Sequence, residues 1–104
     1  MARFDVFNNP DAAERAHTPY FLDVQNDRID GIESRVVIPL RTEQAFGPRA
    51  RDLNPQLNVG EALLVLDTAA LGAVPMNALR RPVMHLSAGR DEVQAALDTL
   101  FGSY

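Results

Sequence analysis

Residues 54–75 read NPQLNVGEALLVLDTAALGAVP, and this stretch decides the fold. It contains two short apolar runs, QLNV and ALLVL, separated by Gly60 and Glu61, a spacing that is typical of a tight β-hairpin. Asp67 and Thr68 then bend the chain before a third run, LGAVPM. We therefore expect three short strands here, the first two of which form the hairpin.

Further strands are predicted toward the N-terminus. RFDVF places Phe4 and Val6 on one face and Arg3, Asp5 and Phe7 on the other, which is the period-2 pattern of a half-buried strand. YFLDVQ repeats this alternation, and SRVVIPL is a β-branched run. The last run contains Pro39, which has no N–H to donate and so predicts a sheet edge or a strand end. Between the first two runs, NNPDAAERAHTP predicts a loop with one short helical turn.

The apolar period changes after Pro82, where the sequence predicts a helix over about 88–101. Ser87 is a candidate N-cap for this helix. An apolar stripe follows at helical spacing and comprises Val93, Ala96, Leu97, Leu100 and Phe101. With strands over about 2–82, the fold class is mainly β: a small, partly open antiparallel barrel that carries one C-terminal α-helix.

The composition indicates one soluble domain over residues 1–104, with 46% hydrophobic residues. There is no cysteine, which excludes disulfides and thiol catalysis and fits a cytoplasmic location. No apolar run is long enough to span a membrane. The formal net charge is -4, and the ten basic residues are all arginine and spread along the chain. This diffuse pattern does not favour binding of nucleic acid by the chain alone.

Motifs for enzyme chemistry are missing from the sequence. His17 and His85 are far apart, and neither has the neighbours of a metal site, so we interpret His17 as a solvated loop residue and His85 as a hydrogen-bonded strand end. No serine lies in G-x-S-x-G, and no glycine-rich phosphate loop is present. In the series Asp23, Asp27 and Asp30, the first residue is expected in a strand and the other two in a turn, so turn-forming and solvated roles are favoured over a carboxylate cluster. We therefore expect no enzyme activity, no catalytic residue, no metal and no cofactor.

Four stretches together resemble the CcdB family of toxin–antitoxin modules. They are FLDVQND at 21–27, RVVIPL at 35–40, LNPQLNVGEALLVLDTAALGAVP at 53–75 and the C-terminal helix, in this order. The resemblance covers nearly the whole chain. It implies an SH3-like barrel with a C-terminal helix and a two-fold homodimer, in which LGAVPM is a candidate interface strand.

The resemblance also implies a function. The expected protein is a non-enzymatic toxin that binds the A subunit of DNA gyrase and traps the gyrase–DNA cleavage complex, as in plasmid maintenance. A CcdA-type antitoxin would neutralise the toxin through a tail that folds on binding. The pair would repress its own operon, so that DNA is contacted only through the antitoxin complex.

The resemblance places the gyrase-binding patch at the last helical turn, the final residues and one loop. The candidate residues are Arg28, Ile29, Asp98, Phe101, Gly102, Ser103 and Tyr104. Toxic members typically end in Trp-Gly-Ile, whereas this chain ends in Gly-Ser-Tyr, which is either offered to a partner or folded back on the core. An alternative therefore remains open, a CcdB-like binding or regulatory module that pairs with an antitoxin and has lost or changed its gyrase target.

Overall fold

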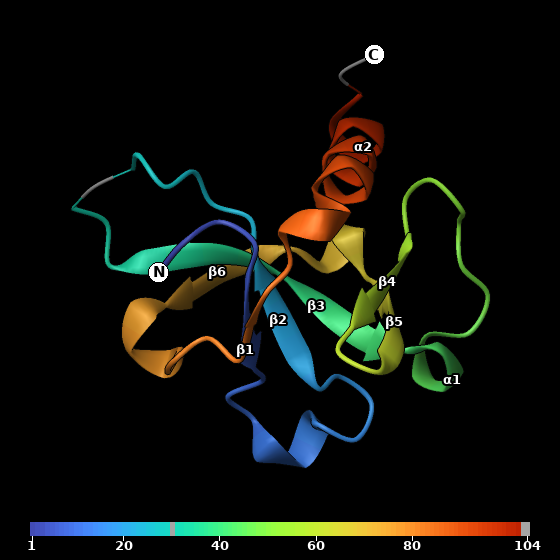
Figure 1. The fold of residues 1–104 in the computed structure, drawn as a ribbon, viewed down its shortest axis with the longest axis horizontal. Coiled ribbons are helices and arrows are strands. Elements are labelled where there is room, and N and C mark those ends of the chain that lie inside the picture. The colour runs from blue at the N-terminus through green and yellow to red at the C-terminus, as the bar shows by residue number, and fades with distance from the viewer. Residues whose placement is uncertain (30, 103–104) are drawn as a thin grey trace.

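A single curled antiparallel sheet forms the body of the protein, and α2 packs against it (Figure 1). The computed structural model describes residues 1–29 and 31–102. Within them, the strands are β1 Asp5–Asn8, β2 Tyr20–Asp23, β3 Ser34–Thr42, β4 Gln56–Val59, β5 Ala62–Leu66, β6 Gly72–Pro75 and β7 Met84–His85. The helices are η1 Ala12–Glu14, α1 Glu43–Phe46, η2 Thr68–Ala70, η3 Met76–Ala78, η4 Ser87–Gly89 and α2 Arg90–Phe101. The predicted fold class, a mainly β half-barrel with one C-terminal helix, is confirmed.

The strand order is β4-β5-β3-β2-β1-β7, with β6 also paired to β3. The predicted hairpin is confirmed as β4 and β5, joined at Gly60, whose φ of 64° lies in the left-handed region that glycine adopts without strain. The predicted helical turn between the first two strands is η1.

The prediction that Pro39 marks an edge or a strand end is wrong, because β3 is the central strand and continues to Thr42. The Pro39 carbonyl accepts a hydrogen bond of 3.0 Å from the Asp67 backbone N–H. The backbone of Pro39 therefore lies opposite Asp67, which is one residue past the end of β5 at Leu66. A proline fits there because no ladder bond requires its missing N–H.

The first strand begins later than predicted, at Asp5, because Phe4 has a φ of 73°. This left-handed conformation is strained for an aromatic residue. It is held by two backbone hydrogen bonds, from the Phe4 N–H to Asp23 at 2.7 Å and from the Leu86 N–H to Phe4 at 2.8 Å. The strand is also covered on both faces rather than half-buried, since Asp5 and its neighbours through Phe7 are all buried.

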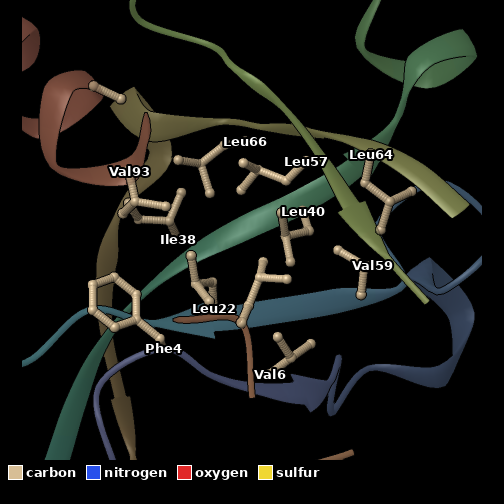
Figure 2. Packing of buried hydrophobic residues seen from close by; sticks show 12 residues of the cluster. Phe4, Val6, Leu22, Ile38, Leu40, Leu57, Val59, Leu64, Leu66 and Val93 are labelled. Atoms are coloured by element: carbon tan, nitrogen blue, oxygen red, sulfur yellow. The ribbon is translucent and has the colours of Figure 1, made fainter. Parts of the chain in front are cut away.

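The main core lies between the concave face of the sheet and α2 (Figure 2). Its buried residues are Phe4, Val6, Leu22, Ile38, Leu40, Leu57, Val59, Leu64, Leu66, Leu86, Val93 and Ala96. A smaller cluster of Phe7, Val37 and Leu79 is separate from it. No described helix is long and apolar enough to cross a membrane.

The helix is docked by its first half. Val93 and Ala96 are fully buried, Leu97 and Leu100 are half-buried, and Phe101 is exposed, so the predicted stripe leaves the core as the helix proceeds. The predicted Ser87 cap is wrong. Ser87 opens η4, and α2 starts only at Arg90 without a side-chain cap, because the chain first makes a 3-10 turn.

Candidate functional site

The C-terminal end of α2 presents an aromatic side chain to solvent. Phe101 is 65% exposed, more than any other large apolar residue that the structure describes. The helix ends at Gly102, whose φ of 72° gives the left-handed cap expected of a glycine there. Its N–H donates to the Asp98 carbonyl at 2.8 Å. The candidates Ser103 and Tyr104 lie outside the described residues.

Arg28 and Ile29 lie in the loop 24–33 between β2 and β3, and both are exposed. The loop is shaped locally by Asn26. Its side-chain oxygen accepts a 2.9 Å hydrogen bond from the Arg28 N–H, and its carbonyl accepts one of 3.2 Å from the Ile29 N–H. These bonds form an Asx-type turn. The turn leaves the Ile29 side chain 44% exposed.

A buried ion pair fixes the base of this loop. The Arg35 guanidinium donates to both carboxylate oxygens of Asp23, at 2.7 and 2.9 Å, and the Asp23 side chain is fully buried. The hydrogen bond from Asp23 raises the pKa of Arg35 further above its ordinary value. The predicted strand position of Asp23 is confirmed, and its Oδ1 accepts a 3.0 Å hydrogen bond from the Gln25 N–H, as a turn-forming aspartate does. Only the predicted solvated role is wrong, because the residue that compensates its charge comes from the neighbouring strand.

Arg3 connects the loop to α2. Its backbone N–H donates to the Asp27 carboxylate, and its Nη2 donates to Gln94 Oε1 at 2.9 Å. The Gln94 Nε2 in turn donates to Asp98 Oδ1 at 3.0 Å on the same helix face. The guanidinium also lies 4.8 Å from the centre of the Phe4 ring, within cation–π distance. The loop and the helix are thus tied together through the N-terminal segment.

We call Arg28, Ile29, Asp98, Phe101 and Gly102 the helix-end surface. Figure 1 shows the loop 24–33 and α2 projecting from the same side of the sheet. The structure brings Asp98, Phe101 and Gly102 together on the last turns of α2. The link to Arg28 and Ile29 is indirect, since no described hydrogen bond or ion pair joins these two side chains to the helix.

An acidic groove of about 440 Å³ runs beside α2. It is lined by Arg51, Asp52, Pro55, Glu92, Ala95, Asp98 and Thr99. Three of these side chains are carboxylates and one is cationic. Within the described part of the chain, no group of three or more histidine and acidic side chains is placed to hold a metal ion. The groove adds negative charge to the flank of the helix-end surface.

A second cavity, of about 360 Å³, lies at the other end of the molecule and was not predicted. Its lining residues are Asn8, Pro10, Arg15, Asn77, Ala78, Arg80 and Arg81, and we call it the arginine pocket. Its walls come from the end of β1, the η1 loop, η3 and the segment that follows η3. The Arg-Arg pair was visible in the sequence, but its meeting with Arg15 depends on the fold.

The two histidines have separate partners. His85 Nδ1 lies 2.9 Å from Asp5 Oδ1 across the β1–β7 pair, which confirms the prediction of a hydrogen-bonded strand end. His17 is exposed in its loop, as predicted, and its Nδ1 lies 3.0 Å from Thr18 Oγ1. Neither imidazole belongs to the helix-end surface or lines the arginine pocket.

Solved structures with this fold include two endoribonucleases, one of them in complex with its antitoxin. The chain is similar to an endoribonuclease in complex with its cognate antitoxin from a mycobacterial species, with a TM-score of 0.77 and 17% identity over 98% of this chain and 95% of that one. It is also similar to an endoribonuclease from a mycobacterial species, with a TM-score of 0.74 and 16% identity over 98% of this chain and 91% of that one. At this identity the likeness concerns the fold.

These neighbours contradict the expectation that the chain is not an enzyme, because both are described as endoribonucleases. That expectation rested on motifs such as G-x-S-x-G and the phosphate loops, which belong to other folds. The missing motifs therefore exclude only the enzyme classes that carry them.

The family comparison covers almost the whole chain. The family model of the CcdB protein matches residues 3–102, a range that includes the sheet, the loop 24–33 and all of α2. The chain belongs to the CcdB family.

Proposed function

We propose that this protein is the toxin of a toxin–antitoxin module and that it binds the A subunit of DNA gyrase through the helix-end surface, trapping the gyrase–DNA cleavage complex. The observation that carries the proposal is the 65% exposure of Phe101 at the end of α2. Burying a phenyl ring stabilises a folded protein by about 1.5–3 kcal/mol. Because the exposed ring of Phe101 does not contribute this stabilisation, its position favours a role in binding. Aromatic side chains of this kind dominate protein–protein binding energies.

The surroundings of Phe101 suit a protein partner. Ile29 and Ile32 of the loop 24–33 add further exposed apolar side chains, and Asp98 and Arg28 add charges of both signs. An apolar centre with a charged rim is the usual composition of a protein interface. Arg3 keeps the loop and the helix in a fixed relation, which limits the entropy lost on binding.

The proposed assembly is a homodimer formed through β6. This strand pairs with β3, and its residues Gly72 and Ala73 are exposed. Small side chains on an exposed strand allow a second copy to approach closely. A two-fold dimer would present two copies of the helix-end surface, one from each chain, to a partner that is itself two-fold symmetric.

A CcdA-type antitoxin is the proposed regulator, and binding to DNA would occur through the toxin–antitoxin complex. The family and the antitoxin-bound neighbour support this pairing. The alternative is a CcdB-like module that keeps the antitoxin and has lost or changed its gyrase target. Arg28 favours this alternative, because it is an exposed charge within the helix-end surface that would have to be desolvated on binding.

A second candidate activity is cleavage of RNA. It is favoured by the endoribonuclease neighbours and by the arginine pocket, which offers three guanidinium groups in one cavity. Arginine side chains bind phosphodiesters and stabilise the negative charge that develops when they are cleaved. This candidate would use the end of the molecule opposite the helix-end surface.

The test is inducible expression in a gyrase-sensitive bacterium, with growth, plasmid linearisation and total RNA integrity measured together. We expect growth arrest with trapped cleavage of the plasmid and intact RNA. The Phe101→Ala variant should abolish the arrest, whereas Leu63→Ala, which truncates a 42% exposed apolar residue on β5, should not. Arrest with degraded RNA and uncut plasmid would replace the gyrase proposal with the second candidate. Normal growth with a soluble protein would favour the altered module.

A further inference from the structure

We propose that the arginine pocket binds the phosphodiester backbone of a single-stranded polynucleotide. The pocket collects Arg15, Arg80 and Arg81, three of the ten arginines of a chain with a net charge of -4. None of its lining residues is acidic. This inference is independent of the gyrase proposal, which uses another surface, and it rests on the pocket that the second candidate function invokes.

The three guanidinium groups lack the partners that the structural arginines have. Arg35 and Arg41 each form a 2.7 Å ion pair with an aspartate. Among the described residues, no carboxylate lies within 4.0 Å of a guanidinium nitrogen of the three pocket arginines. Like charges gathered in one cavity repel one another unless an anion is bound between them.

Arg15 is positioned by a buried asparagine. The Arg15 Nε donates a 2.6 Å hydrogen bond to the Asn9 carbonyl, which leaves both terminal nitrogens of the fork without a described partner. Asn9 is itself only 1% exposed, and its side chain bonds to the Thr18 carbonyl and the Asp11 N–H, both at 2.9 Å. The Arg15 side chain is therefore held in position without a ligand.

Arg80 and Arg81 are held at both ends of their segment. The preceding Leu79 is buried in the smaller apolar cluster. The following Val83 donates its N–H to the Val6 carbonyl at 2.8 Å. The two arginines thus lie in a short segment that is attached to the sheet on both sides, at Leu79 and at Val83. Their exposed side chains line the pocket.

The shape of the site favours a single strand. The pocket shares Asn8, Asn77, Arg80 and Arg81 with an adjoining, more open hollow of about 990 Å³, so that a chain of phosphates could continue from one into the other. Arginine forks match phosphate oxygens in a bidentate way, and two asparagine amides supply donors and acceptors for ribose or base edges. A rigid duplex cannot enter such a concave site, whereas an unpaired strand can.

The experiment measures binding of a fluorescently labelled uridine 10-mer to the full-length protein by anisotropy at several salt concentrations. A deoxythymidine 10-mer, inorganic phosphate and a labelled oligoglutamate serve as comparison ligands. The test variant is Arg80→Gln/Arg81→Gln. The control is Arg28→Gln/Arg51→Gln, which removes the same charge from two exposed arginines outside the pocket. Melting temperatures of both variants check that the fold is kept.

We expect the test variant to bind the RNA or the DNA strand at least tenfold more weakly, while the control changes by less than threefold. The slope of log K against log salt should fall by about 0.7 for each lost phosphate contact. Equal losses in both variants, no binding of either strand, or tighter binding of oligoglutamate than of RNA would overturn the proposal. The Phe101→Ala variant should bind RNA normally, so failure of this inference is distinguishable from failure of the gyrase proposal.

Discussion

The two ends of the molecule carry opposite chemistry. At one end, the helix-end surface combines an exposed phenyl ring and Ile29 with the acidic groove along α2. At the other end, the arginine pocket is cationic and its lining includes no carboxylate. The net charge of -4 is a sum over the whole chain and describes neither region. The partner class of a small domain follows from how the fold distributes its side chains rather than from their sum.

Both regions are built in the same way, since each places its functional groups just beyond a firmly anchored residue. Phe101 stands two turns beyond the fully buried Val93, and the Arg80–Arg81 segment follows the buried Leu79. The anchors should therefore carry the stability, and the groups beyond them should carry the binding. Substitutions can separate the two roles.

The largest effect is expected at the ion pair beneath the loop 24–33. Arg35→Met leaves the fully buried Asp23 carboxylate without its partner, and breaking such a pair costs about 3–5 kcal/mol. Urea denaturation measures this loss. The matched double variant Asp23→Leu/Arg35→Met, which removes both charges, should recover most of it. A loss below about 1 kcal/mol for the single variant would show that the pair does not anchor the loop.

A smaller effect is expected from the helix itself. Leu97 packs against the core but is only half-buried, so Leu97→Ala should cost about 2 kcal/mol, the lower end of the range for leucine truncations. The measurement is the free energy of unfolding in urea, with Leu63→Ala, the same truncation at a 42% exposed position on β5, as a control. An unchanged free energy would mean that α2 is held elsewhere than along this stripe.

The smallest effect on stability is expected at the two functional ends. Phe101→Ala and Arg80→Gln/Arg81→Gln alter exposed side chains, so each should change the free energy of unfolding by less than about 0.5 kcal/mol. Thermal unfolding measures this. If either variant were destabilised by 2 kcal/mol, the corresponding region would be structural, and the contrast between anchors and binding groups would fail there.

The sequence predicted the elements whose signals are local. The hairpin at Gly60, the C-terminal helix and the role of His85 follow from turn chemistry, apolar period and spacing, and the structure confirms them. The errors at Pro39 and Asp23 have a common cause. The Pro39 carbonyl is hydrogen-bonded by Asp67, and the Asp23 carboxylate is paired with Arg35. Both partners come from other segments of the chain, which a local sequence pattern does not identify.

The candidate sites divide in the same way. Exposure of Phe101 could be anticipated because the apolar stripe runs past the end of the part of the helix that the sheet can cover. The arginine pocket could not, because Arg15 and Arg80 lie far apart in the chain and meet only after β1 pairs with β7. The predicted residues Ser103 and Tyr104 lie outside the described residues, so their proposed role stays a prediction.

The central claim is that Phe101 and its neighbours bind gyrase. The most direct measurement adds the purified protein to purified DNA gyrase and supercoiled plasmid, followed by detergent and protease, and quantifies linear DNA. We predict dose-dependent linear DNA with the unaltered protein. Phe101→Ala should need about 30-fold more protein for the same yield, which corresponds to about 2 kcal/mol at an aromatic hot spot. No linear DNA at any concentration, or equal potency of the two proteins, would contradict the account.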